Sequence, residues 1–325
     1  MREITMQDTQ KDHEISVLAA NSIFFIGVFM LFTLNFLMHR MHFEWEMLGI
    51  STFLMQIAFF LMPAFLYLII KRKNLRYVLR LNKLSLGNTL LVIAITIFAV
   101  PTISAINYMI YAIVNALGRP LPNPLPVIDN MYSLVIGIVI IAIAPAICEE
   151  VMARGVIMRG YERFGNKTAW AISAILFSIM HRNIQSVVPI FLIGLLLAYI
   201  VYRTNSIWAG VVAHFINNAV AIALLYVARK MQQILGMSEE QIDQAATLET
   251  DIFTIIIVIG AFIFCLTAVI GFMALLIQNT KKINHNNVYR SISKPKAPFT
   301  HYIPLIIGLF LIVLDFVWQV QYILG

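Results

Sequence analysis

Three separated stretches of this sequence place residues of catalytic type inside long apolar runs. They contain carboxylates, histidines and an amide, with one arginine and one phenylalanine: Glu149, Glu150 and Arg154; Phe177 and His181; and His214 and Asn218. Carboxylates and histidines can move protons to and from water, and an amide donor can hold a negatively charged oxygen. Because an ionisable group costs at least ~2.5 kcal/mol in the middle of a bilayer, a cluster of such groups there indicates a functional site.

Helical spacing gives the two adjacent glutamates different surroundings. Glu150 and Arg154 are four residues apart, so on a helix they share one face and form a natural ion pair. Glu149 is rotated by about 100° from its neighbour and stays clear of that arginine. His214 and Asn218 are also four apart and share a face. We therefore expect a structural carboxylate at Glu150 and an available one at Glu149.

The composition of the chain indicates that its solvent is a lipid bilayer. Of its 325 residues, 60% are hydrophobic and 12% are charged, whereas a soluble domain is nearer half apolar and a quarter charged. Inside a bilayer every backbone polar group must be paired internally, and with no alternating strand pattern this requires helices. We expect an all-α integral membrane protein, a polytopic helical bundle of about eight to nine transmembrane helices.

Runs of about 20 apolar residues mark nine candidate spans. They cover roughly 15–38, 47–70, 88–117, 132–163, 167–182, 186–203, 206–228, 252–278 and 301–323. The fourth run carries Arg159, Glu162 and Arg163 in its last turns, so we expect this helix to continue past the hydrocarbon. Asp315, in the last run, is expected to pair with a polar group of a neighbouring helix more often than to face a cavity.

The basic residues lie mostly on the same side of these spans as the N-terminus, and they explain the net charge of +7. By the positive-inside rule the N-terminus is cytoplasmic, and nine spans would leave the C-terminus outside the cell membrane. We expect membrane lipids as partners and no nucleic acid, because no continuous basic module occurs. The basic stretch 71–83 fits either an interfacial helix on anionic headgroups or an ordinary basic loop.

The constant rise of a helix tests whether the polar groups can meet. Counted from the cytoplasmic ends of their helices, Glu149 and His181 each lie about 21 Å along. His214 and Asn218 lie about 12 and 18 Å along theirs. The four groups can therefore share one layer of the bundle. The three polar motifs are accordingly predicted to line one cavity.

In order and spacing these motifs resemble those of the CPBP family, the CAAX prenyl protease and bacteriocin-processing (Abi) group of intramembrane proteases. The family's motifs are a Glu-Glu pair followed by Arg, a Phe separated by three residues from a His, and a later His separated by three residues from an Asn or similar residue. The resemblance covers roughly residues 130–225. It implies an endopeptidase that hydrolyses a peptide bond of a membrane-associated or lipidated (CAAX-type) protein or peptide.

The resemblance also implies roles for individual residues. Glu149 would activate a water together with His181, while His214 and Asn218 would stabilise the oxyanion. The supporting residues would be Glu150, Arg154 and Phe177. By the same reading the chain divides into 1–129, the N-terminal helices with a basic interfacial loop; 130–228, the protease core; and 229–325, an acidic outer loop and two C-terminal helices.

The sequence favours no cofactor, although zinc is an alternative. Members of the family have also been described as metalloproteases, and Glu149, His181 and His214 could bind Zn²⁺ with an open fourth position. The chain lacks the His-Glu-x-x-His helix in which two ligands and the base are pre-spaced. Only two cysteines occur, both within apolar runs, so neither a disulfide framework nor a thiolate cluster is indicated. A metal-free glutamate mechanism is therefore preferred.

Two other functional classes stay open on the sequence. A scaffold or regulatory protein could use the same fold to bind a membrane partner without cleaving it. A proton-coupled transporter could use paired carboxylates and histidines as a relay. The discriminating observation is whether the polar residues line one cavity, as a protease needs, or lie along a continuous path, as a transporter needs.

Overall fold

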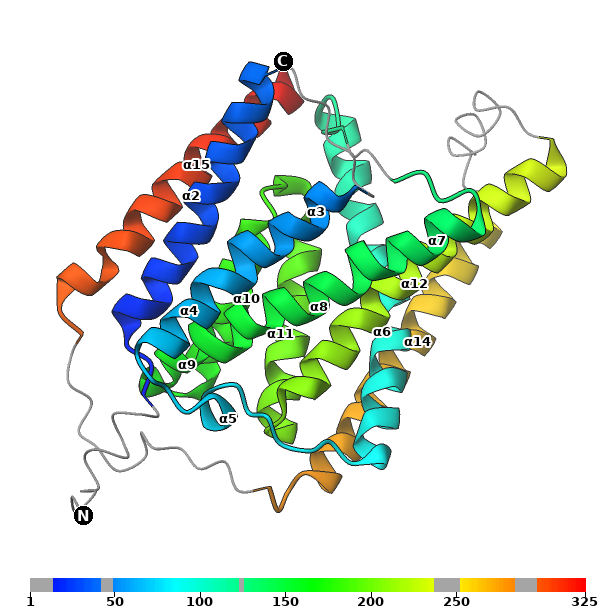
Figure 1. The fold of residues 1–325 in the computed structure, drawn as a ribbon. Helices are drawn as coiled ribbons and strands as arrows, with labels where there is room; N and C mark the ends of the chain where they lie inside the picture. Colours follow the sequence, from blue (N-terminus) through cyan, green and yellow to red (C-terminus); the bar gives the residue numbers. More distant parts are fainter. Residues whose placement is uncertain (1–13, 42–48, 123–125, 237–251, 284–296) are drawn as a thin grey trace, which may run out of the picture.

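The computed structural model describes residues 14–41, 49–122, 126–236, 252–283 and 297–325, and it is a bundle of helices (Figure 1). Its main helices are α2 (Val17–Met41), α3 (Ile50–Met55), α4 (Met62–Ile70), α6 (Leu86–Leu117), α10 (Asn166–Met180), α11 (Val187–Thr204), α12 (Ile207–Leu235), α14 (Ile252–Asn279) and α15 (Ile303–Leu324). Within these described ranges, eight helical segments are long and apolar enough to cross a membrane. The expected polytopic all-α membrane protein is confirmed.

The fifth candidate span, 167–182, becomes the shorter helix α10. At 15 residues it falls below the length of a full membrane crossing, which accounts for eight span-length helices rather than nine. Gly165 precedes it with φ 103°, a conformation that turns the chain back before the helix begins. The helix ends at His181, and the short 3-10 turn η5 (Ile184–Ser186) leads into α11, which packs against it.

The fourth span is one long helical segment, Met131–Phe164, as its charged last turns predict. It consists of α7 (Met131–Gly137), η2 (Ile138–Ile143), α8 (Ala144–Glu150), η3 (Val151–Ile157), α9 (Met158–Tyr161) and η4 (Glu162–Phe164). The turns η2 and η3 are π-helical, and they lie on either side of the segment that carries both glutamates. Such wider turns are frequent at functional sites.

The basic stretch after α4 does not form a helix over its whole length, and one of its arginines is buried against the protein. Only α5 (Leu75–Val78) is helical there. Arg80 is buried and forms an ion pair with Glu162, while the Arg159 guanidinium donates to the Val78 carbonyl and to Glu162. Burial, reinforced by Arg159, lowers the pKa of Arg80 to about 10, which leaves it charged near neutrality. Arg80 therefore pairs with a buried carboxylate rather than with lipid headgroups.

The helices outside the fourth to seventh candidate spans cover two opposite flanks. On one flank α15 packs along α2, and on the other α14 packs along α6, as Figure 1 shows. A Cβ on Gly308 of α15 would stand 3.0 Å from the Phe24 ring of α2, so the close approach of these helices depends on a small residue. The acidic outer loop expected at 229–251 lies partly in 237–251, outside the described residues.

The two ends of the bundle differ in a way that bears on orientation. The first turn of α2, the short α5 and the last turn of α14 lie at one end, and the last turn of α15 lies at the other (Figure 1). The basic residues that follow α4 are therefore grouped at the end where α2 begins. A cytoplasmic location of this end stays a prediction of the positive-inside rule.

Candidate active site

The carboxylate of Glu150 is fully buried and anchored by an arginine of its own helix. Arg154 donates to its Oε1 at 2.8 Å, the ion pair that the four-residue spacing predicts. The second terminal nitrogen of this guanidinium donates to the carbonyl of Gly194 on α11, at 3.0 Å. A buried charge is tolerable when it is paired and hydrogen-bonded, and this pair is both, although Oε2 of Glu150 and Nε of Arg154 have no hydrogen-bond partner among the described residues. It also ties α8 and η3 to α11.

Phe177 joins the three motifs into one cluster. The Arg154 guanidinium lies over its ring, 4.5 Å from the centroid. The His181 and His214 rings meet the Phe177 ring edge to face, with centroids 4.9 and 5.8 Å away. The structure thus brings the predicted supporting residues and both histidines together around one aromatic ring.

His214 contacts Glu150, a pairing that the sequence analysis missed. Its Nδ1 lies 3.1 Å from the same Oε1 that accepts from Arg154, so Glu150 stands between two nitrogen donors. A Cβ on Gly210, four residues before His214, would stand 2.6 Å from the Glu150 Oε2. A glycine one turn before a membrane histidine is the one sequence signal of this close approach, because only glycine leaves room for a neighbouring carboxylate.

Glu149 is the available carboxylate. Its side chain is 7% exposed, and its Oε2 accepts no hydrogen bond from the described residues. The Nε2 of His181 lies 3.9 Å from this oxygen, and the His181 side chain is 36% exposed, so it stands at the mouth of the site. The equal depth predicted for these two residues is what the structure has, although one comes from α8 and the other from the end of α10.

The tautomer of neutral His181 follows from its other nitrogen. Nδ1 lies 2.8 Å from the backbone carbonyl oxygen of Phe177, which can only accept. The proton of a neutral ring is therefore on Nδ1, and the lone pair of Nε2 faces Glu149. A separation of 3.9 Å is too long for a hydrogen bond, but one water oxygen can lie within hydrogen-bond reach of both atoms.

Asn218 is held at a carbonyl that proline leaves open. Pro145 has no N–H, so the carbonyl of Ile141, four residues earlier, lacks its usual helical donor. The Asn218 amide nitrogen donates to that carbonyl at 2.9 Å, and its oxygen accepts from Asn217. An amide nitrogen carries two hydrogens, and Ile141 uses one of them. Asn218 lies one turn beyond His214 along α12, where its predicted oxyanion role stays a prediction.

The zinc alternative has no ready ligand set in the part of the chain that the structure describes. There, no three His, Cys, Asp or Glu side chains gather closely enough to hold a metal ion. Of the three ligands considered, Glu149 and His181 face each other, whereas Nδ1 of His214 faces Glu150. No step is therefore assigned to a metal, and the favoured mechanism without cofactor stays a prediction.

Comparisons with known proteins agree with the region that carries this cluster. Residues 131–220 match the model of the Rce1-like family, described as "Type II CAAX prenyl endopeptidase Rce1-like". The chain is 25% identical over 131 residues to "Putative membrane peptidase YdiL" of Bacillus subtilis (strain 168), an alignment that covers 40% of this chain and 52% of that relative. The chain thus spans about half the length of the curated relative that it matches.

No solved structure matches the chain. All seven predicted site residues lie between Glu149 and Asn218, inside the matched segment. The resemblance of the three motifs to the CPBP family is therefore confirmed, because all three lie in the segment that matches the Rce1-like model.

Proposed function

We propose that this protein is an intramembrane endopeptidase that hydrolyses a peptide bond with a water activated by Glu149 and His181. The observation that carries the proposal is the facing pair of a buried carboxylate oxygen without a hydrogen-bond donor among the described residues and the lone pair of His181 Nε2, 3.9 Å away. A water between them donates one hydrogen bond to each group. A lone pair of its oxygen is then free to point toward a substrate carbonyl.

The reaction runs by general acid and base catalysis. Glu149 takes a proton from the water as the oxygen attacks the carbonyl carbon, and a tetrahedral oxyanion forms. Glu149 then delivers this proton to the leaving amine, and the C–N bond breaks. His214 in its protonated form donates from Nδ1 to Glu150 and from Nε2 to the oxyanion, and Asn218 offers its second amide hydrogen. Glu150 and Arg154 hold the helix turn that presents Glu149.

The compactness of the cluster favours hydrolysis over a proton relay. The rings of His181 and His214 both contact Phe177, and Glu149 and Glu150 are adjacent on α8. A transporter needs groups that lead from one side of the membrane to the other, whereas these groups surround one point. A non-catalytic scaffold would also keep the cluster. A measurement of peptide cleavage therefore decides between a protease and a scaffold.

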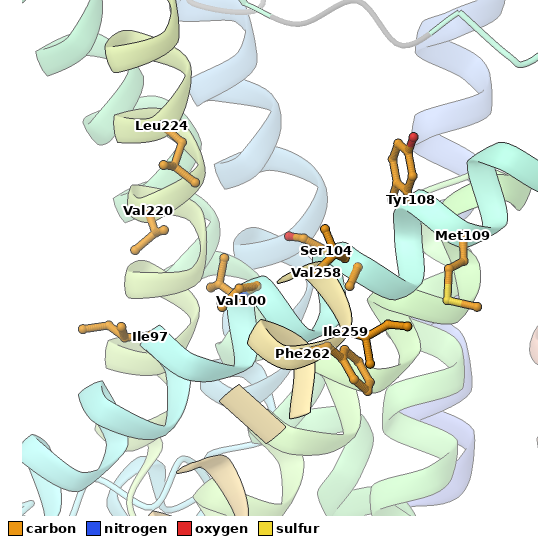
Figure 2. A pocket seen from close by; sticks show the side chains of 12 residues that line it. Ile97, Val100, Ser104, Tyr108, Met109, Val220, Leu224, Val258, Ile259 and Phe262 are labelled. Atoms are coloured by element: carbon orange, nitrogen blue, oxygen red, sulfur yellow. The ribbon is translucent and has the colours of Figure 1, made fainter. Parts of the chain in front are cut away.

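A lipid-modified substrate is the class that an apolar cavity beside α12 fits best, although none of the seven site residues lines that cavity. A cavity of about 830 Å³ lies between α6, α12 and α14 (Figure 2), and it reaches α12 in the middle of that helix. Its lining is apolar apart from Ser104 and Tyr108. Val220 and Leu224 line it from α12, and at 100° per residue they are rotated by about 200° and 240° from Asn218. We assign this cavity to the apolar chain of a lipidated protein or peptide.

Purified protein and a panel of quenched peptides, lipidated and unlipidated, test the proposed activity. We expect cleavage by the wild type and a loss of about 10²- to 10³-fold in kcat for His181→Ala, because the water loses one of its two acceptors. Thermal unfolding should show that the variant is folded, since His181 is partly exposed. Equal turnover by both proteins would contradict the proposed function.

A chelator experiment on the same preparation tests the metal-free mechanism. We expect activity to survive thorough chelation unchanged. Loss of activity that zinc restores would overturn the glutamate mechanism and assign Glu149, His181 and His214 to a metal instead.

Filling the cavity tests the lipidated substrate. We expect Leu224→Trp to raise KM for a lipidated peptide about 10-fold, equivalent to about 1.4 kcal/mol of binding, because the indole occupies the space of the apolar chain. KM for the matching unlipidated peptide should stay unchanged. Ile263→Trp, on an exposed position of α14 outside the cavity lining, serves as the control. Equal effects on both peptides would show that the cavity does not hold the lipid.

A further inference from the structure

The turn that follows His181 is held by the C-terminal helix α15. This helix lies outside the segment that matches the Rce1-like family, which ends at residue 220. Three residues after His181, the N–H of Ile184 donates to Oε1 of Gln319 at 2.8 Å. The Nε2 of the same amide donates to the carbonyl of Arg182 at 2.8 Å. One buried side chain of α15 thus satisfies both a donor and an acceptor of the turn backbone.

The side chain of Arg182 fastens the turn a second time. Its Nε and one terminal nitrogen donate to the two carboxylate oxygens of Asp315, at 3.0 and 3.1 Å. Such a two-bonded arginine–carboxylate pair fixes direction as well as distance. Asp315 also accepts from Gln319 at 3.2 Å, and the guanidinium lies over the Phe32 ring of α2, 4.1 Å from its centroid. Asp315 therefore pairs with another segment's polar group, the more common of the two fates considered for it.

The backbone at this turn needs external support. Arg182 has φ 52°, in the left-handed region that residues with a Cβ avoid. This conformation stops α10 directly after His181, whose N–H donates to Ser178 and whose Nδ1 donates to Phe177. The last turn of a helix frays readily when nothing holds the chain beyond it. The ring of His181 can face Glu149 only while this last turn is formed.

We infer that Gln319 and Asp315 are positioning residues for His181, which act by locking the turn 182–184 against α15. The inference rests on the proposed function for its kinetic part, but the locking itself is independent of catalysis. α15 is in turn fixed to α2 through Gly308 and Phe24. A helix far along the chain from the matched segment thereby sets the separation of Nε2 of His181 from Glu149.

Replacing Gln319 by methionine tests this inference with two measurements. Met has a similar volume and can make neither hydrogen bond. We expect amide hydrogen exchange of residues 182–186 to become at least about 10-fold faster, because the Ile184 N–H loses its acceptor. We expect kcat to fall about 10- to 100-fold with KM within about threefold, because His181 is displaced while the apolar cavity assigned to the lipid chain is untouched. Asp315→Asn, which keeps the side-chain shape, should give a smaller change in the same direction.

The control removes a comparable amide elsewhere on the same flank. Asn21 of α2 donates to the carbonyl of His301 in η7 (Phe299–Tyr302), at the start of α15 and away from the turn. Asn21→Leu should lower thermal stability but leave the exchange of 182–186 and kcat within about threefold of wild type. Unchanged exchange in Gln319→Met, or an equal loss of kcat in Asn21→Leu, would overturn the inference. Exchange needs no substrate, so it decides the locking even if the peptide assay with His181→Ala shows that the proposed function is wrong.

Discussion

Glu149→Gln is expected to lower kcat by about 10³-fold and to leave the protein as stable as wild type or more so. The amide has nearly the shape of the carboxylate but cannot accept a proton from water, and loss of a general base costs typically 10²- to 10⁴-fold. Stability should not fall, because Oε2 of Glu149 accepts no hydrogen bond from the described residues. A buried polar group without such a bond is a cost that function imposes on the fold.

The measurement is kcat on a quenched peptide together with thermal unfolding of the same preparation. Glu150→Gln is the matched control, since it makes the same chemical change one residue further along α8. It removes the charge that Arg154 and His214 bind, so it should lower the unfolding temperature. Turnover by Glu149→Gln at the rate of wild type would refute the proposed role of Glu149, and a loss of stability there would show a structural role.

Arg154→Met is expected to destabilise the protein by about 3–5 kcal/mol, the largest effect on folding that we predict. The substitution leaves the fully buried carboxylate of Glu150 without its main counter-charge. It also leaves the Gly194 carbonyl without its guanidinium donor and Phe177 without the cation over its ring. Breaking one half of a buried pair costs more than removing both, because the remaining charge has no compensation.

Equilibrium unfolding in mixed micelles measures this cost. The double variant Glu150→Met, Arg154→Met should recover most of the lost stability, since it removes the uncompensated charge. Lys167→Met, at an exposed position in the first turn of α10, should change stability by no more than about 0.5 kcal/mol. If Arg154→Met cost no more than Lys167→Met, the buried pair would not be the anchor of α8 and η3.

The features that were predictable from the sequence are those that one helix decides by itself. The bilayer forces backbone pairing within each segment, so apolar run length located the eight span-length helices, although it also counted the shorter α10 as a ninth span. A fixed rise of about 1.5 Å per residue put Glu149 and His181 at one depth, and a fixed rotation separated Glu149 from Glu150. The pairing of Glu150 with Arg154 is equally local, because both residues lie on one face of one helical segment.

Contacts between segments were decided by the tertiary structure alone. Helical periodicity gives the faces of one helix but not how that helix is rotated against its neighbours. For this reason the contact of His214 with Glu150, and the donation of Asn218 to Ile141, were not visible in the sequence. Arg80 shows the same limit, because the sequence allowed it a place on an interfacial helix or in a basic loop, and only the tertiary structure pairs it with Glu162.

The turn after His181 makes the distinction sharpest. The sequence by itself determined the membrane bundle, the common depth of the polar groups and the different surroundings of the two glutamates. All three follow from the geometry of single helices. The hydrogen bonds that fix this turn join residues more than 130 positions apart in the chain: Gln319 and Asp315 of α15 bind Arg182 and Ile184. Only the packing of α15 on α2 brings those side chains to the turn, because Gly308 lets the two helices approach closely.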